Sequence, residues 1–365
     1  MTNKEFIAEF SHKELDSNLI LVNEKENSYA KIQHISHNII DLEEWNKNKG
    51  KDKLKFIIHK KREYDQLIKF MRNEILNSEN LDLWQLSYEG ENLPPNSFFL
   101  QFQFTLAKPF ISRDDENFYI IENPVRKDKV FKVPMMSPAG WKGNLRWAAM
   151  KNFGDSNLKT REELFKDRLK IIRLFGNENQ PIKKHMNRVI SKKMFNDEKF
   201  ADEIDKDFEK YLENEIEQLE KVDGLQGRLH FYPTFFDRID LEVINPHDRT
   251  TRAGKNPIYF EVVPAGATGY FSLLWFPFDC IGNEDTKDQM KEDWKIIATA
   301  LKELLFTYGF SAKKTSGYGV IKNEIEKAKF LVGGTKINLN YDNNINFDSF
   351  LTEIGQKINE VNNGK

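Results

Sequence analysis

Residues 98–106 are FFLQFQFTL, and this short stretch decides the fold. Its polar residues Gln101, Gln103 and Thr105 alternate with apolar residues, and a period of two is typical of a β-strand whose two faces differ. The pair Pro94-Pro95 breaks the chain just before this stretch. The sequence therefore predicts the first strand of a sheet, directly after a boundary.

The elements that follow residues 98–106 set the architecture. We expect helices at Gly140–Phe153 and 287–308, and strands at 228–232, Ile258–Val263 and Gly269–Phe278. Val320–Phe330 should be strand-like or mixed in structure. The helix at 287–308 has its apolar residues on one stripe, and Gly309 follows it as a C-cap. The order strand, helix, strands, helix, strand favours an α+β sheet with helices on one face, of ferredoxin-like (RRM-like) type.

Segments outside this core divide the chain further. In the polar N-terminal part we expect a strand at Leu54–Ile58 and a helix at Glu63–Leu76. A charged, mostly helical segment interrupts the core, and an Asn-rich tail ends the chain. The predicted regions are an N-terminal extension, a core with its insertion and a C-terminal tail, at 1–95, 96–335 with 155–222 inserted, and 336–365.

Composition limits the classes of function. The 365 residues are 39% hydrophobic and 31% charged, which suits a globular protein with a core. The formal net charge is −2, so nucleic-acid binding would need local basic patches. The single cysteine, Cys280, excludes a disulfide framework or a cysteine zinc site within the chain. Because no apolar run could span a membrane and no signal peptide is evident, we expect a cytoplasmic protein without membrane contacts.

The first candidate site is KKTSGYG, residues 313–319, after the helix at 287–308. Glycines accept positive φ, and successive N–H groups in such turns can bind an anion, while lysines and hydroxyls add charge and donors. These parts suit a phosphodiester, although an ordinary surface turn explains the same residues equally well. The candidate RNA-binding residues are Lys313, Lys314, Thr315, Ser316, Gly317 and Gly319.

A second basic cluster lies at the start of the helix expected over Gly140–Phe153. Lys142 and Arg146 are four positions apart and so share a helix face. Free N–H groups at a helix N-terminus attract phosphate. Residues 126–151 contain seven Lys or Arg and one acid, Asp128. The alternative is a charged helix face without a ligand.

A third basic cluster spans His247–Lys255, just before the strand expected at Ile258–Val263. Arg249 and Arg252 stand here on a loop that contains a glycine. Cations on such a loop suit a grip on a nucleic-acid backbone. A solvated hairpin tip is the alternative.

Taken in this order, the motifs resemble the RAMP superfamily, the repeat-associated proteins of CRISPR systems. The similar elements are Ser137 with Lys142-Gly143 and Arg146, Leu174-Phe175-Gly176, Gly227-Arg228-Leu229, Arg249–Gly254 with Glu261–Gly266, and Lys314–Gly319. They cover about residues 98–330, whereas Pro138–Trp141 departs from the family's usual Gly-Ser-Ser-Leu. The resemblance implies a ferredoxin-like RAMP core that binds RNA.

Within the superfamily, the run ENPVRKD at Glu122–Asp128 is most similar to the backbone subunits of type III effector complexes. Those subunits stack along the guide RNA, and several cleave bound target RNA. Cleaving members have an Asp before the x-Pro-Val element, where this chain has Glu122, whose side chain is one methylene longer. The resemblance implies that Glu122 would hold a divalent metal such as Mg²⁺ or position an attacking 2′-hydroxyl. An exposed loop carboxylate is the alternative.

The resemblance thus implies a CRISPR-associated subunit that grips the guide RNA backbone in an antiviral effector complex. Its partners would be guide RNA, target RNA and other effector subunits. Cleavage of target RNA, and hence enzymatic activity, stays open at this point. The alternatives are a stand-alone metal-dependent endoribonuclease that processes guide RNA and a non-catalytic scaffold that contacts only protein.

Overall fold

The computed structural model describes residues 29–30, 32–33, 44–77, 82–89, 92–114, 119–157, 160–215, 225–245, 250, 254, 257–283 and 285–363. The chain divides into two compact units. Unit 1 comprises Met1–Leu83, Ile111–Met135 and Phe236–Ala267. Unit 2 comprises Trp84–Phe110, Met136–Phe235 and Thr268–Lys365. Each unit is therefore assembled from three separate segments of the sequence.

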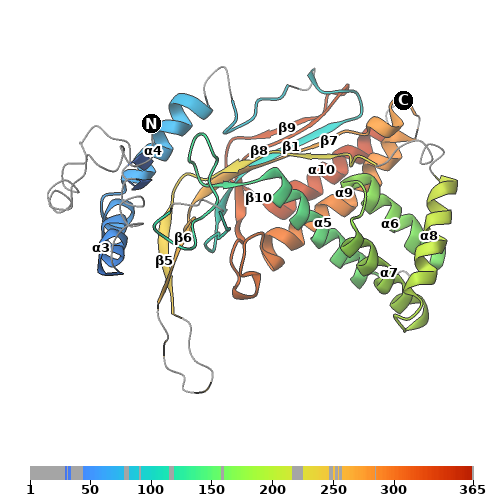
Figure 1. Ribbon diagram of the computed structural model, residues 1–365. Helices are drawn as coiled ribbons and strands as arrows, with labels where there is room; N and C mark the ends of the chain where they lie inside the picture. Colours follow the sequence, from blue (N-terminus) through green and yellow to red (C-terminus); the bar gives the residue numbers. More distant parts are fainter. Residues whose placement is uncertain are drawn as a thin grey trace, which may run out of the picture. The chain divides into compact units, whose positions relative to one another are not determined.

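Unit 2 is built on an antiparallel sheet with the strand order β10-β8-β1-β7-β3, and β9 pairs with β8 (Figure 1). The central strand β1 pairs with both β7 and β8, and Phe98 lies opposite Trp275 on one side and Val332 on the other. The strands are β1 (Phe98–Leu106), β3 (Leu229–Phe231), β7 (Thr268–Trp275), β8 (Ile321–Val332), β9 (Asn338–Tyr341) and β10 (Ile345–Asn346). The strand predicted at 98–106 is confirmed.

Helices α5, α9 and α10 cover one face of this sheet (Figure 1). Their bounds are Pro138–Asp155 for α5, Thr286–Lys302 for α9, which a π-helical turn over Glu303–Tyr308 extends, and Phe347–Asn363 for α10. The start of α5 follows from its sequence, because Ser137 Oγ accepts a hydrogen bond from Gly140 N (3.1 Å) and Pro138 needs no N–H partner in the first turn. The two helices predicted within the core are confirmed.

The alternation in β1 separates two environments. On the helix side, Phe98 packs edge-on against Trp294 of α9, with ring centroids 5.7 Å apart. On the other side, buried Gln101 forms a hydrogen bond with Ser272 Oγ of β7 (2.9 Å). A buried amide without such a partner would be costly. Phe99, on the same side as Gln101, is also buried, in a second apolar cluster with Leu93 and Leu331. Both faces of β1 are therefore packed, and the mixed helical and β character expected from the sequence is confirmed.

Three further helices in unit 2 lie within the segment predicted as an insertion: α6 (Arg161–Phe175), α7 (Gln180–Phe195) and α8 (Ala201–Glu215). Thr160 and Glu163 form a capping box at the start of α6. Buried Arg168 joins the helices, because it forms an ion pair with Glu178 (2.6 Å) and donates to Asn187 Oδ1 of α7 (2.7 Å). Its guanidinium also lies 3.9 Å from the ring centroid of Phe208 of α8, so Arg168 contacts the other two helices of the group.

Unit 1 combines helices with a two-stranded antiparallel sheet of β5 (Asp240–Ile244) and β6 (Ile258–Val262). Among its described helices are α3 (Glu44–Lys55), which runs into a π-helical turn over Phe56–Lys60, and α4 (Glu63–Phe70), which runs into another over Met71–Leu76. The remaining short elements of the two units are β2 (Met135–Met136), β4 (Thr234–Phe235) and 3₁₀ turns at Phe278–Cys280 and Lys314–Ser316. None of the helices in the described residues is long and apolar enough to cross a membrane.

The strand predicted at Leu54–Ile58 is wrong, because this stretch is helical. Leu54, Ile57 and Ile58 are buried, whereas Phe56 between them is 45% exposed. A spacing of three and four residues places side chains on one face of a helix. The segment is too short for its apolar residues alone to distinguish the two periods. The neighbouring helix expected at 63–76 is confirmed.

Candidate nucleic-acid interface

Two glycines close the loop that the sequence singled out as a phosphate site. Gly309 and Gly319 both have φ of +73°, and Phe310 N donates to the carbonyl of Gly319 (3.0 Å). Gly319 N in turn donates to the carbonyl of Pro109 (2.8 Å). A Cβ on Gly319 would lie 2.6 Å from the backbone nitrogen of Ser311, closer than such atoms approach. Glycine at position 319 therefore allows the close backbone approach that shapes the loop.

Backbone N–H groups inside this loop already have carbonyl partners. Ser316 N donates to the carbonyl of Lys313 and Gly317 N to that of Lys314, each at 2.9 Å, in a single 3₁₀ turn. In this structure these groups are not directed at an anion. Contacts with phosphate would therefore come from side chains, and those of Thr315 and Ser316 are exposed.

Lys314 joins the loop to α5. Its Nζ forms a hydrogen bond with Asn144 Oδ1 (2.6 Å) and lies 4.6 Å from the ring centroid of Trp147. Burial lowers the pKa of Lys314. Trp147 is 42% exposed and packs edge-on against Tyr308, with ring centroids 4.7 Å apart. The first and second predicted basic clusters thus meet in one place, which the sequence alone could not show.

The two cations predicted on α5 have different surroundings. The guanidinium of Arg146 donates to the carbonyls of Phe175 and Gly176 (2.8 Å for Gly176), at the C-terminal end of α6. Burial lowers the pKa of Arg146, as it does that of Lys142, which also faces the positive charge of Arg146. Lys142 has no carboxylate partner within the described residues. Arg146 therefore caps α6, while Lys142 keeps its donors for another group.

Three of the predicted site residues remain: Arg249, Arg252 and Glu122. Arg249 and Arg252 lie outside the described residues. Glu122 belongs to unit 1. Its side chain is 64% exposed, and its Oε1 lies 3.9 Å from Lys51 Nζ.

The surroundings of Glu122 do not form a metal centre by themselves. Across the described residues, no group of three or more His, Cys, Asp or Glu is placed to hold a metal ion. Mg²⁺ requires near-octahedral oxygen coordination, which one exposed carboxylate beside a lysine does not supply. No reaction step through a metal follows from these residues.

A buried carboxylate, which the sequence identified only as part of a family motif, holds the chain next to Glu122. Glu261 of β6 is fully buried and forms an ion pair with Lys127, which is also buried. It accepts hydrogen bonds from the Tyr119 hydroxyl and from Val125 N (3.2 Å). The sequence does contain a hint of this role, because Glu261 is an acid inside the apolar strand expected at 258–263. A charge buried in such a strand needs a partner of opposite charge. Glu261 is therefore a positioning residue for the segment that carries Glu122.

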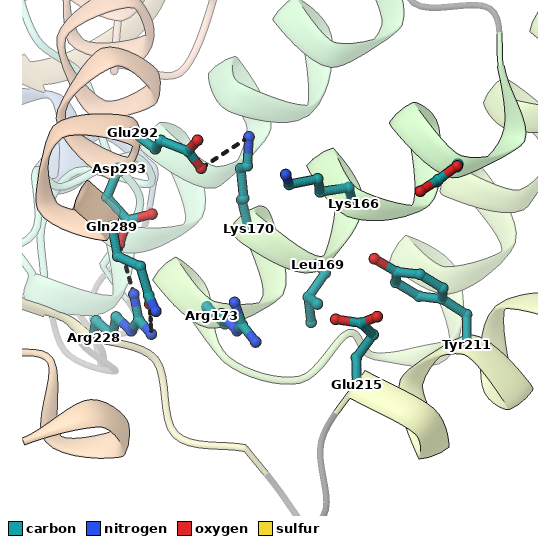
Figure 2. Close-up of a pocket in the computed structure, with 11 residues that line it drawn as sticks. Lys166, Leu169, Lys170, Arg173, Tyr211, Glu215, Arg228, Gln289, Glu292 and Asp293 are labelled. Atoms are coloured by element: carbon teal, nitrogen blue, oxygen red, sulfur yellow. Dashed lines mark hydrogen bonds and ion pairs between the residues drawn. The ribbon is translucent and has the colours of Figure 1, made fainter. Parts of the chain in front are cut away.

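A pocket of about 240 Å³ lies between α6, α8 and α9 in unit 2 (Figure 2). It is lined by four cations and four acids: Lys166, Lys170, Arg173, Arg228, Glu162, Glu215, Glu292 and Asp293. Lys170 Nζ lies 3.2 Å from Glu292, and Arg228 lies 3.0 Å from Asp293. Because the charges are balanced, this pocket has no electrostatic preference for phosphate.

Comparison with models of protein families identifies the family of the chain. The model of the RAMP superfamily matches residues 90–322. The chain belongs to the RAMP superfamily. The matched part of this RAMP protein includes the core strand β1, helix α5, Glu122 and the loop at 313–319.

Solved structures similar to this RAMP protein are distant. A chain of the type III-B Cmr-beta complex bound to cognate target RNA is 14% identical, with a TM-score of 0.40, and 88% of each chain is covered. A chain of the Csm3–Csm4 subcomplex of the type III-A CRISPR-Cas interference complex is 13% identical (TM-score 0.36, covering 73% of this chain and 98% of that one). Methanopyrus kandleri Csm3 is 14% identical (TM-score 0.38, 74% and 98%). No curated protein matches. At these low TM-scores the likenesses carry no functional argument.

Proposed function

We propose that this RAMP protein is an RNA-binding subunit of a CRISPR effector complex that holds guide RNA by its phosphate backbone. The observation that carries the proposal is the hydrogen bond between Lys314 and Asn144, which brings the loop at 313–319 against α5. Lys142 and Lys314 then offer charge, and Thr315 and Ser316 offer hydroxyl donors. Contacts of this kind position RNA without reading its bases, which suits a protein that must accept any guide.

The exposed ring of Trp147 fits the same proposal. Proteins that bind single strands combine a basic surface with aromatic side chains on which bases stack. Trp147 is 42% exposed and stands directly beside Lys314, so a cation and an aromatic surface occur together. Membership of the RAMP superfamily and the order of the sequence motifs also support an RNA-binding role. The motif at Glu122–Asp128 favours a backbone subunit of a type III complex, with guide RNA, target RNA and neighbouring effector subunits as partners.

We infer in addition that the core has a ferredoxin-like topology. Its support is the chain order β1, α5, β3, β7, α9, β8, which follows the β-α-β-β-α-β pattern of that fold. These four strands lie in the sheet in the order β8-β1-β7-β3, and every neighbouring pair among them is antiparallel. The other strands and helices would be elaborations of this core.

RNA binding by the full chain tests the proposed function. Fluorescence anisotropy with unstructured single-stranded RNAs of unrelated sequence should give similar affinities that fall steeply with salt. The double change Lys313→Ala/Lys314→Ala should weaken binding about tenfold and reduce the salt slope by about 0.7 for each phosphate that the protein no longer binds. The matched control Lys302→Ala/Lys357→Ala removes the same charge from α9 and α10 and should leave affinity unchanged.

Two results would overturn this function. Affinity that depends neither on salt nor on Lys313 and Lys314 would remove the loop as the grip. A purified chain that carries no nucleic acid and binds none would favour the alternative of a scaffold that contacts only protein.

Cleavage of bound target RNA is a finer proposal that rests on Glu122 alone. Because the described residues do not build a metal centre there, the test must not presume one. Labelled target RNA should be incubated with the guide-bound chain, with and without Mg²⁺, for the native protein and for Glu122→Ala. Loss of cleavage with unchanged RNA binding would place Glu122 in the mechanism. Cleavage of a guide precursor without any target would instead favour the alternative of a processing endoribonuclease.

A further inference from the structure

A second basic surface lies on unit 1, in a part of the chain that the sequence motifs did not single out. Residues 51–72 contain eight Lys or Arg against three acids, Asp52, Glu63 and Asp65. The segment therefore carries a formal charge of +5 (8 − 3) in a chain whose total is −2. It forms the end of α3, the π-helical turn after it, the whole of α4 and the first two residues of the next π-helical turn.

A pocket of about 440 Å³ gathers part of this charge. Its charged lining consists of Arg62, Lys69, Arg72, Arg238, Asp65 and Asp237. Four cations thus face two acids, in contrast to the balanced pocket on α6 (Figure 2). A concave surface with an excess of one charge concentrates ligands of the opposite charge. The volume lies within the roughly 300–1,000 Å³ that is usual for ligand pockets.

The two acids are engaged in holding the rim of the pocket. Asp65 accepts a hydrogen bond from Ile239 N (3.2 Å) and lies 3.6 Å from Arg62, and burial raises its pKa. Asp237 accepts two hydrogen bonds from the guanidinium of Arg238 (3.2 and 3.1 Å). The side chains of Arg62 and Arg238 nevertheless remain 48% and 42% exposed. Arg62 also lies 3.5 Å from Asp240, which is not part of the pocket lining. Each guanidinium is therefore oriented by carboxylates and still has donors that face solvent.

The positive charge of Lys69 is not paired with a carboxylate in the described part of the chain. The residue is exposed, and within the described residues no acid lies within ion-pair distance of it. Phe70, the next residue of α4, is 53% exposed. Phe70 is not part of the pocket lining, but it adds an exposed aromatic surface to the same helix, and proteins that bind single strands combine basic surfaces with aromatic ones.

We propose that this basic pocket, formed by Arg62, Lys69, Arg72 and Arg238, binds a phosphodiester of a bound RNA strand. The inference rests on the proposed RNA-binding function and adds a second grip to the one on unit 2. Three of the four cations are arginines, whose planar guanidinium matches the oxygens of a phosphate. An acidic protein segment is the rival occupant, but it would leave the exposed Phe70 without a role.

The test compares two double variants of the full chain. Lys69→Gln/Arg238→Gln removes two charges, whereas Lys69→Arg/Arg238→Lys retains them and serves as the matched control. Binding to long and short single-stranded RNA is measured over a range of salt concentrations. The charge-removing variant should bind long RNA about fivefold more weakly, with a salt slope smaller by about 0.7, because the pocket neutralises one phosphate of the strand. Binding of short RNA, which one grip can hold alone, should not change.

A photocrosslink provides an independent measurement. RNA that lies in the pocket should crosslink to a peptide that contains Phe70, and the crosslink should disappear in Lys69→Gln/Arg238→Gln but persist in the charge-retaining control. Thermal melting of both variants should match the native chain, so that weaker binding is not confused with impaired folding.

The outcomes separate this inference from the proposed function. Unchanged binding of long RNA by Lys69→Gln/Arg238→Gln, together with weakened binding by Lys313→Ala/Lys314→Ala, would overturn the pocket and leave the function standing. Binding of poly-glutamate is measured as a probe for an acidic protein segment. If the native chain binds it and Lys69→Gln/Arg238→Gln loses this binding while RNA binding is unchanged, the pocket belongs to an acidic protein segment and the inference is overturned. A native chain that binds no RNA would overturn both.

Discussion

Arg228 and Lys314 are both cations of unit 2, but their surroundings are opposite. The Arg228 side chain is only 2% exposed and forms ion pairs with Asp279 (2.6 Å) and Asp293 (3.0 Å). Lys314 has a neutral amide partner, Asn144, and lies over the ring of Trp147. The difference teaches that the carboxylates within reach, more than the number of cations in the sequence, decide whether a basic residue can meet a phosphate.

The largest effect in this comparison should come from removing the buried cation. Arg228→Met would leave two carboxylates, one of them fully buried, without their partner. We expect the free energy of unfolding to fall by about 3–5 kcal/mol, because an uncompensated buried charge is costly. Urea denaturation followed by circular dichroism measures this change.

A second change tests the cause of that destabilisation. Arg228→Met/Asp293→Asn removes the buried charge as well as the cation, and should recover part of the stability. A double variant that is no more stable than Arg228→Met would show that the destabilisation comes from packing rather than from the unpaired carboxylate.

The next largest effect should be a dependence of the free energy of unfolding on pH, caused by the ionisation of Asp293. Burial raises its pKa from 3.8 to about 6, against the opposing effect of Arg228. The folded state therefore holds this proton more tightly than the unfolded state does. Its contribution to stability is complete below pH 3.8 and is lost as the pH rises to about 6. Relative to Asp293→Asn, the native chain should lose about 3 kcal/mol over that window, since one pKa unit corresponds to about 1.36 kcal/mol. Identical pH profiles of the two proteins would contradict the prediction.

A smaller loss of stability should follow from alanine at two glycines of the loop that carries Lys314. Comparing the two distinguishes a steric clash from backbone strain alone. A methyl group on Gly319 would meet the backbone of Ser311, whereas one on Gly317, whose φ is +76°, would meet nothing within 4 Å. Gly319→Ala should cost about 2–3 kcal/mol and weaken RNA binding, because strain and a clash act together. Gly317→Ala carries only the left-handed strain of about 1 kcal/mol. Equal melting temperatures for both variants would show that the close backbone approach at 319 is not a constraint.

Sequence patterns predicted the parts of the fold that depend on neighbours along the chain. The alternation at 98–106 predicted the central strand, and the apolar stripe at 287–308 with Gly309 predicted the core helix α9 with its π-helical extension. The strand expected at Leu54–Ile58 was wrong, because burial on one helical face left only Phe56 exposed and five residues do not define a period. The predicted regions 1–95, 96–335 with their insertion and 336–365 stay a prediction.

The candidate site was less predictable, because it depends on contacts between distant segments. The sequence identified Lys314 and the α5 cluster separately but could not show that Lys314 reaches Asn144. Arg146 matched the same motif, yet its guanidinium is used by two backbone carbonyls at the end of α6. The role of Glu261 could not be predicted, because the buried cation that pairs with it, Lys127, is more than a hundred residues away in sequence.

Lys314→Met is the counterpart of Arg228→Met and should have the smallest effect on stability. Both substitutions replace a cation by methionine. In Lys314→Met, however, no buried carboxylate loses its partner, and the methionine side chain still covers Trp147. We expect the free energy of unfolding to change by less than about 1 kcal/mol, the size of an exposed cation–π interaction. Affinity for single-stranded RNA should nevertheless fall severalfold, because one phosphate is no longer neutralised. Denaturation and anisotropy on the same preparation would measure both quantities. A large decrease in the stability of Lys314→Met would mean that Lys314, like Arg228, serves the fold rather than a ligand.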